Sequence, residues 1–210
     1  MTNEVCLACH QRPDQSIGLP SGEALDISAD PQAFQSSVHG NAGLSCTQCH
    51  TNITGYPHPA IEAQSAKEYS LQFQQTCKNC HLEQFEANQD SMHARLLTEG
   101  NINAPTCASC HNPHTQQKLM DDNGKLLTEA KVWVAETCAQ CHSAIFEQYK
   151  DSVHGAGISQ GESATDSPTC TDCHGVHSIP DPTTAEFRIN SPEICADCHT
   201  DETKMAKYGL

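Results

Sequence analysis

The chain has 210 residues, of which only 37% are hydrophobic and 5% aromatic, and its formal net charge is −15. This charge disfavours binding to nucleic-acid phosphates, and no apolar run approaches the roughly 18–20 residues needed to cross a bilayer. The apolar fraction lies below the roughly 45–50% usual in globular domains, so the chain needs another source of cohesion against the entropy lost on folding. Its 14 Cys and 13 His indicate that source.

Short helices separated by loops are the predicted elements. Helices are expected at 61–76, 82–99, 127–141 and 192–205. The last of these would be capped by Ser191, with Pro192 in its first turn. Asp122-Asn123-Gly124 predicts a small hairpin within 118–127. The Gly-, Ser- and Pro-rich segments at 155–168 and 179–184 are expected to be loops. The predicted fold class is therefore mostly helix and coil with little sheet.

All 14 cysteines fall into Cys-x-x-Cys pairs, and a histidine follows each pair at once. Cys-x-x-Cys-His is the attachment sequence of c-type haem, in which two thiols bond to the porphyrin and the adjacent imidazole binds the iron. Structural zinc gives no reason for a histidine after every pair. A thioredoxin-like motif occurs once per βαβ unit, and a disulfide framework needs no single repeated spacing. We therefore predict seven haem c groups, each with iron, at Cys6/Cys9/His10, Cys46/Cys49/His50, Cys77/Cys80/His81, Cys107/Cys110/His111, Cys138/Cys141/His142, Cys170/Cys173/His174 and Cys195/Cys198/His199.

The six remaining histidines alternate strictly with the seven motifs along the chain. Scattered surface histidines would not follow this order, so we expect them to be distal axial ligands that make six-coordinate, low-spin, bis-histidine haems. The haems would then form the core of the fold. The predicted distal ligands are His39, His58, His93, His114, His154 and His177.

Local sequence supports this assignment. His39 and His154 lie in Ser-Val-His-Gly, and His93 lies in the related Ser-Met-His-Ala. His114 and His177 each lie three residues after a motif histidine. Because three residues reach at most about 10–11 Å, neither can pass around a porphyrin edge to the opposite face of its own haem. We expect each to bind the iron of a neighbouring haem.

The pattern is an internal repeat that carries two haem motifs. The repeat runs from Cys6 to His58, from Cys77 to His114 and from Cys138 to His177, and a fourth copy begins at Cys195. We expect one multihaem domain over 1–210, with quasi-repeats at about 1–60, 61–120 and 121–182 and a half repeat at 183–210.

Six distal candidates serve seven motifs, and by strict order the last motif, which ends at His199, lacks its partner. Four explanations stay open for this deficit. The native chain continues past Leu210, Met205 or Met120 binds the iron, another protein or intrinsic donor supplies the ligand, or the site is open to substrate.

The motif also bears on cellular location. This type of haem attachment takes place outside the cytoplasmic membrane, yet no signal peptide precedes Cys6. We therefore expect a processed or engineered N-terminus and a fragment or processed form of a longer protein. A periplasmic or extracellular location follows, including that of the exposed domain of a membrane-anchored protein.

The Cys-x-x-Cys-His-x-x-His elements at 107–114 and 170–177, with the Ser-Val-His-Gly histidines, resemble multihaem c-type cytochromes with doubled motifs. That group includes the nitrite reductase and hydroxylamine oxidoreductase line, tetrahaem quinol-oxidising cytochromes and cytochrome filaments. The resemblance implies closely packed haems. Two features depart from the catalytic members: no motif has Lys in place of its histidine, and none of the four tyrosines lies in a recognisable crosslink context.

The favoured hypothesis is electron transfer in anaerobic or extracellular respiration, because two histidines per iron leave no position for a substrate. The expected partners are redox proteins, such as a membrane quinol-oxidising subunit or other cytochromes, with a homo-oligomer or filament as a variant and no nucleic acid. The alternative is a reductase of a small nitrogen or sulfur oxyanion at an incompletely ligated C-terminal haem, with Lys204 and Lys207 as an entry patch.

Overall fold

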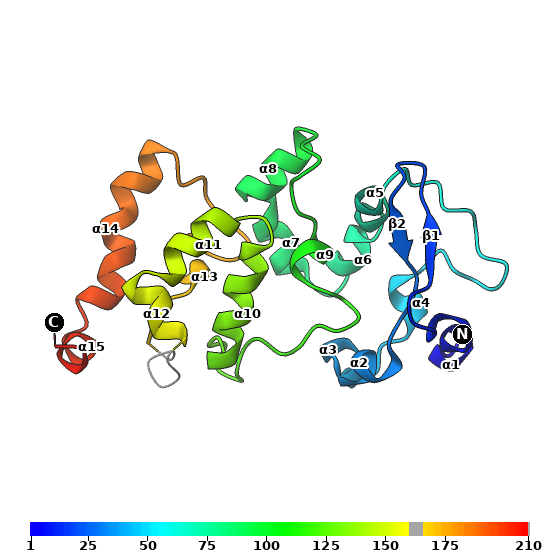
Figure 1. Cartoon of the computed structure of the whole chain (residues 1–210), viewed down its shortest axis with the longest axis horizontal. Coiled ribbons are helices and arrows are strands. Elements are labelled where there is room, and N and C mark those ends of the chain that lie inside the picture. Colours follow the sequence, from blue (N-terminus) through cyan, green and yellow to red (C-terminus); the bar gives the residue numbers. More distant parts are fainter. Residues whose placement is uncertain (160–165, 210) are drawn as a thin grey trace. The chain divides into compact units, whose positions relative to one another are not determined.

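The computed structural model describes residues 1–159 and 166–209 and consists mostly of short helices and coil (Figure 1). The predicted fold class is confirmed. The two strands are β1 (Ser16–Gly18) and β2 (Ala24–Asp26). The described helices are α1 (Asn3–His10), α2 (Pro31–Ser36), α3 (Val38–Asn41), α4 (Cys46–Cys49), α5 (Ala66–Leu71), α6 (Gln74–Lys78), α7 (Leu82–Gln89), α8 (Met92–Thr98), α9 (Cys107–Cys110), α10 (Thr128–Ala139), α11 (Ser143–Lys150), α12 (Val153–Ser159), α13 (Cys170–His174), α14 (Ala185–His199) and α15 (Glu202–Lys207).

The chain divides into two compact units. The first unit comprises Met1–Glu86 and Glu99–Lys118, and the second comprises Ala87–Thr98 and Leu119–Leu210. Two contacts attach α8 to the second unit. The backbone N–H of Met92 donates to the carbonyl oxygen of Ile179 at 2.8 Å, and Arg95 forms an ion pair with Asp181 at 3.2 Å. The division therefore cuts through the second quasi-repeat.

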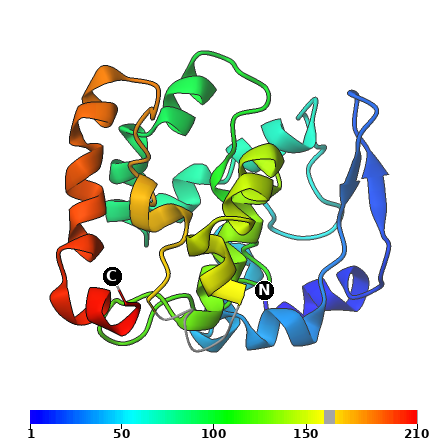
Figure 2. The same cartoon turned by 60° about the vertical axis from the view of Figure 1, so that its left-hand side comes forward.

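The sheet content of the described residues is small and lies mainly in a hairpin that the sequence did not predict. Strands β1 and β2 pair antiparallel, with Ser16 opposite Asp26 (Figure 2). The hairpin expected within 118–127 is present as a single antiparallel bridge between Met120 and Leu126. Gly124 has a φ of 77° in its turn, a conformation that glycine adopts without steric cost.

The predicted helices are confirmed in place. The segment 127–141 forms one helix, α10, whereas each of the other three segments is divided between two helices. The 61–76 segment contains α5 and α6. The 82–99 segment is broken at Ser91, whose hydroxyl accepts from the N–H of Ala94 at 3.0 Å. Thr184, not Ser191, caps α14, and Pro192 lies inside that helix.

The two predicted loops differ in outcome. The expected loop at 155–168 is wrong for 155–159, which belong to α12. Its residues 160–165 lie outside the described part of the chain. The expected loop at 179–184 is confirmed, since these residues lie between α13 and α14 and belong to neither helix.

Protein side chains alone form almost no core in the described part of the chain. Its buried hydrophobic residues include four alanines and only two larger side chains, Leu19 and Ile158. The largest fully buried side chains are polar and small, namely Thr169, Ser37 and Ser91. Each of these three residues directly precedes a helix that carries a candidate haem residue, namely α13, α3 and α8. The most buried side chains therefore lie where these helices begin.

Candidate functional site

The second Cys-x-x-Cys-His motif of each full repeat begins at a capped helical turn. These turns are α4, α9 and α13, and each shows a reciprocal capping box. In such a box the cap side chain accepts a backbone N–H while the third helical residue accepts the N–H of the cap. The caps are Ser45, Thr106 and Thr169, and the reciprocal side chains are Gln48, Ser109 and Asp172. The sequence signal for these caps, a Ser or Thr directly before the first cysteine, was not used in the prediction.

The first motif of each repeat is placed differently, at the C-terminal end of a helix. Helix α1 ends at His10 and α14 ends at His199. Helix α6 ends at Lys78, one residue after Cys77, and α10 ends at Ala139, one residue after Cys138. Each repeat therefore presents one motif at a helix end and one on a capped turn.

The second cysteine in the first motif of each full repeat is exposed, although the predicted role in haem attachment would place it against the core. The exposure of these thiols does not test whether they attach haem, so their attachment to haem stays a prediction. The backbone nevertheless holds two of them in one turn with the first cysteine of the motif, since their N–H groups donate to its carbonyl oxygen at 3.2 Å. The first cysteines of the same motifs are half-buried, so each motif spans from the interior to the surface. The exposed residues are Cys9, Cys80 and Cys141, and the two held by the 3.2 Å bonds are Cys80 and Cys141.

The Ser-x-His elements have one local structure. In each, the serine hydroxyl accepts a hydrogen bond from the backbone N–H three residues later, directly after the histidine. The distances are 3.0 Å for Ser37 and Gly40, 3.0 Å for Ser91 and Ala94, and 3.2 Å for Ser152 and Gly155. Helices α3, α8 and α12 therefore begin one residue before the histidine, which fixes the histidine in the first turn.

Two of these elements require glycine after the histidine because the preceding helix passes very close. A Cβ atom at Gly40 would lie 2.0 Å from the carbonyl oxygen of Phe34. A Cβ atom at Gly155 would lie 2.1 Å from the carbonyl oxygen of Tyr149. The Ser-Val-His-Gly sequence thus specifies a tight junction that aims His39 and His154.

The predicted haem histidines meet in pairs. Two imidazoles that bind one metal ion from opposite sides, with metal–nitrogen bonds of about 2 Å, have ring centres roughly 6 Å apart. Five pairs in the structure have this separation. They are His10–His58 at 5.9 Å, His39–His81 at 6.2 Å, His50–His114 at 6.0 Å, His93–His142 at 6.1 Å and His154–His199 at 6.2 Å.

Each pair joins one motif histidine to one of the six others. The Ser-x-His histidine of a repeat faces the first motif of the following repeat, as His39 faces His81. His114 faces His50 of the preceding repeat, which agrees with the expectation that it does not serve its own motif. Residues 1–159 and 166–209 contain no cluster of three or more His, Cys, Asp or Glu side chains able to hold a metal ion.

The structure corrects the position of the missing partner. Strict order predicted that His199 would lack a histidine opposite it, but His154 occupies that place. The ring beside His174 is instead that of Phe187, with a centroid distance of 5.5 Å and planes 4° apart. The prediction was wrong because His154, from the third repeat, faces the last motif although the sixth motif lies between them in the sequence.

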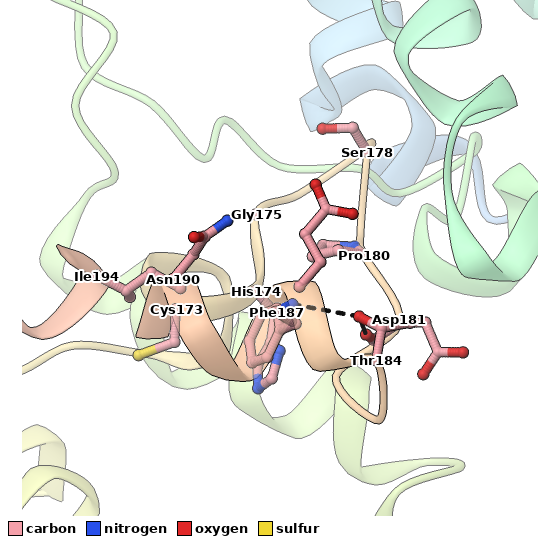
Figure 3. A pocket seen from close by; sticks show the side chains of 11 residues that line it. Cys173, His174, Gly175, Ser178, Pro180, Asp181, Thr184, Phe187, Asn190 and Ile194 are labelled. Carbon is pink, nitrogen blue, oxygen red and sulfur yellow. Dashed lines mark hydrogen bonds between the residues drawn. The ribbon is translucent and has the colours of Figure 1, made fainter. Parts of the chain in front are cut away.

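A cavity of about 450 Å³ opens against His174 (Figure 3). Loop 178–184 and the start of α14 form its walls, and the N–H of Phe187 donates to the Thr184 hydroxyl at 3.2 Å. Carboxylates of Asp181 and Glu186 contribute to its lining. Of the two other histidines outside the five pairs, His111 lies at the end of α9 and His177 lies in the loop after α13.

Hydrogen bonds set the tautomer of several of these rings. The Nδ1 atom of His10 lies 2.6 Å from the carbonyl oxygen of Ile27, and those of His39 and His58 lie 2.9 and 2.8 Å from carbonyl oxygens. A carbonyl only accepts, so each Nδ1 carries the proton and Nε2 keeps its lone pair for a metal.

Burial keeps three of the paired rings neutral. It is the main cause that lowers the pKa of His50, His93 and His114 below the usual value. A nearby imidazole in the facing ring adds to the lowering for His50 and His93. Neutral imidazole is the form that binds metal.

The cysteines of successive motifs lie beside one another. A hydrogen bond with Cys107 lowers the pKa of Cys77 to about 6, and one with Cys138 lowers the pKa of Cys170 to about 7. Cys46 is likewise hydrogen-bonded to Cys6. The thiols of Cys6, Cys46, Cys77 and Cys170 form no disulfide, so their sulfur atoms are available for bonds to a porphyrin.

Comparisons with known proteins agree with this site. The family model for cytochrome c3 matches the chain twice, over residues 38–125 and 122–200. The match covers well over half of the chain and defines a multihaem c-type cytochrome, a class of electron-transfer proteins. The chain belongs to the cytochrome c3 family.

A curated relative extends this finding. The chain is 26% identical to the multihaem cytochrome MtrA of Shewanella baltica over 210 residues, 94% of this chain and 52% of the relative. The chain thus spans about half the length of that relative. No solved structure matches it. Among the described residues, no helix has the length and apolar character needed to span a membrane.

Proposed function

We propose that the chain binds seven haem c groups, one at each Cys-x-x-Cys-His motif, and conducts electrons from one haem to the next. The observation that carries the proposal is the ring spacing of the five histidine pairs, 5.9–6.2 Å. That spacing fits an iron between two imidazoles, and bound haem supplies reversible one-electron chemistry there. The two cysteines and first histidine of each motif would hold the group.

The pairs give the protein's contribution to this function. In each pair both imidazoles would hold the iron, which would leave no place for a substrate to bind. The hydrogen bonds from Nδ1 of His10, His39 and His58 to carbonyl oxygens hold the rings in orientation and raise the basicity of the ligand nitrogen. Histidine ligation without methionine favours low reduction potentials, which suit anaerobic respiration.

The neighbouring cysteines indicate the order in which electrons would pass. In the first unit, Cys46 is hydrogen-bonded to Cys6, and Cys77 is hydrogen-bonded to Cys107. The nearby Cys77 also helps to raise the pKa of Cys49. In the second unit, Cys138 is hydrogen-bonded to Cys170. The nearby Cys195 and Cys198 help to raise the pKa of Cys173. Successive motifs within each unit would therefore hold their haems close together.

The surface and the attachment chemistry suggest where and with what the chain works. The net charge of −15 favours redox partners with basic surfaces, among them other cytochromes or a membrane quinol-oxidising subunit. Covalent haem attachment places the protein in the periplasm or outside the cell. The oxyanion-reductase alternative required an open haem at His199, and the ring of His154 opposite it removes that support.

Intact-mass spectrometry of the purified holoprotein tests the haem count. The expected mass is that of the chain plus seven haems. Electron paramagnetic resonance of the oxidised protein should show predominantly low-spin ferric signals. The control is the variant Cys46→Ala/Cys49→Ala, which should lose the mass of one haem. Fewer than six haems on the unaltered chain would overturn the proposal.

A further inference from the structure

The repeats contact one another through one recurring backbone bond. The donor is the backbone N–H of residue x in a Ser-x-His element. The acceptor is a carbonyl oxygen in the next repeat, five residues after the histidine of that repeat's second motif. Val38 bonds in this way to Gln116 and Met92 to Ile179, both at 2.8 Å. Both donors are half-buried. The loop that follows a second motif therefore docks on the repeat before it.

In the first unit this docking also delivers a histidine. The loop at 112–116 places His114 opposite His50, and the carbonyl of Pro113 accepts from Nδ1 of His39 at 2.9 Å. One loop therefore provides the ring that faces His50, a backbone acceptor for Val38 and an acceptor for His39.

The third repeat shows the same elements without such a loop among the described residues. Val153 corresponds to Val38 and Met92, but its side chain is 89% exposed. His174 corresponds to His50, but the ring beside it belongs to Phe187, which has no atom that binds iron. In the first unit a docked loop bonds to Val38 and places a histidine opposite His50. No described loop does this at the equivalent residues Val153 and His174.

We propose that the second unit carries a receptor surface for one more loop of the Cys-x-x-Cys-His-x-x-His type, from outside residues 1–210. The surface is made of Val153 with the start of α12 and of the cavity at His174, and the incoming histidine would face His174. The inference rests on the proposed haem at the sixth motif. Asp181 and Glu186 at the cavity favour a neutral imidazole over an anionic ligand.

The test uses the haem-loaded 210-residue protein and a blocked peptide with the sequence of residues 112–117, Asn-Pro-His-Thr-Gln-Gln. In the oxidised protein the haem of the sixth motif should be high-spin, and the peptide should convert it to low-spin in absorption and paramagnetic resonance spectra. Free imidazole should do the same at about tenfold higher concentration, because it lacks the backbone contacts. A peptide with alanine in place of histidine should have no effect.

Variants locate the site. Cys170→Ala/Cys173→Ala should abolish the high-spin signal, whereas Cys195→Ala/Cys198→Ala should retain it. Val153→Asp should remove the advantage of the peptide over free imidazole and leave the imidazole affinity unchanged. Ile145→Asp, at a residue 62% exposed in the same unit, is the matched control and should alter neither.

Three outcomes would overturn the inference. They are an oxidised protein with all seven haems low-spin, a high-spin signal that disappears with Cys195→Ala/Cys198→Ala instead, and conversion that follows protein concentration together with dimer formation. The last result would assign the donor to a second copy of this chain. A mass with fewer than six haems would count against the proposed function, so the two failures are distinguishable.

Discussion

The two compact units are built from the same parts but complete them differently. In the first unit three motif histidines, at 10, 50 and 81, face a histidine of the same unit. In the second unit His142 and His199 do so, while His174 faces Phe187. Four of the five pairs join a motif to a histidine of a neighbouring repeat, whereas His10 and His58 belong to one repeat. The local sequence of a motif therefore does not identify the histidine that faces it.

The largest expected effect applies to both units alike. Produced without haem, the chain should be largely unfolded, because its described buried hydrophobic side chains are mostly alanines and cofactor binding would supply the folding free energy. Circular dichroism should show weak helicity and no cooperative melting, whereas the haem-loaded control should show both. A haem-free chain that melts cooperatively would contradict this expectation and show that one unit has a sufficient protein core.

The next effect separates the units directly. His154→Ala removes the ring that faces His199, so the number of high-spin haems in the oxidised protein should rise by one. The matched variant in the first unit is His114→Ala, which removes the ring that faces His50 and should give the same increase. Magnetic circular dichroism measures the number of high-spin haems in both variants. If His154→Ala left the spin state unchanged, the pairing of His154 with His199 would be wrong.

Sequence reasoning reached different depths at different residues. The fold class followed from the short helical segments and loops. The cytochrome class followed from Cys-x-x-Cys-His, because the residues that attach haem are adjacent in the sequence. The pairing of His154 with His199 could not be derived, since a contact across 45 positions depends on how repeats stack. The hairpin at Ser16–Asp26 lacked a two-residue turn signal. The break at Ser91 was missed because the apolar pattern continues through it.

A smaller effect compares the two tight junctions. Gly40→Ala and Gly155→Ala should each lower the free energy of unfolding by about 1–3 kcal/mol, because the new methyl group meets a backbone carbonyl at 2.0 or 2.1 Å. Gly55→Ala is the control, since a Cβ atom there has no neighbour within 4 Å. Guanidinium unfolding of the holoproteins measures all three. Equal stability of Gly155→Ala and Gly55→Ala would mean that α11 can move away from α12.

The smallest effect compares equivalent helix caps in the two units. Thr169 is 1% exposed, and its hydroxyl also donates to the carbonyl oxygen of Lys131 at 3.1 Å. Ser45 is only half-buried. Loss of a cap costs about 1 kcal/mol, and loss of a second, buried hydrogen bond adds about 0.5–1.5 kcal/mol. Thr169→Ala should therefore destabilise the holoprotein more than Ser45→Ala.

The substitution Thr169→Ser provides the control, because serine keeps the hydroxyl for both bonds and loses only a methyl group. Urea unfolding should rank the three variants with Thr169→Ala least stable, while Thr169→Ser stays within about 1.5 kcal/mol of the unaltered protein. If Thr169→Ala and Ser45→Ala were equally destabilised, the bond to Lys131 would contribute nothing. The cap of the sixth motif would then stabilise the protein no more than the cap of the second motif does. Of these two motifs, the second has a facing histidine at His50, whereas His174 of the sixth faces Phe187.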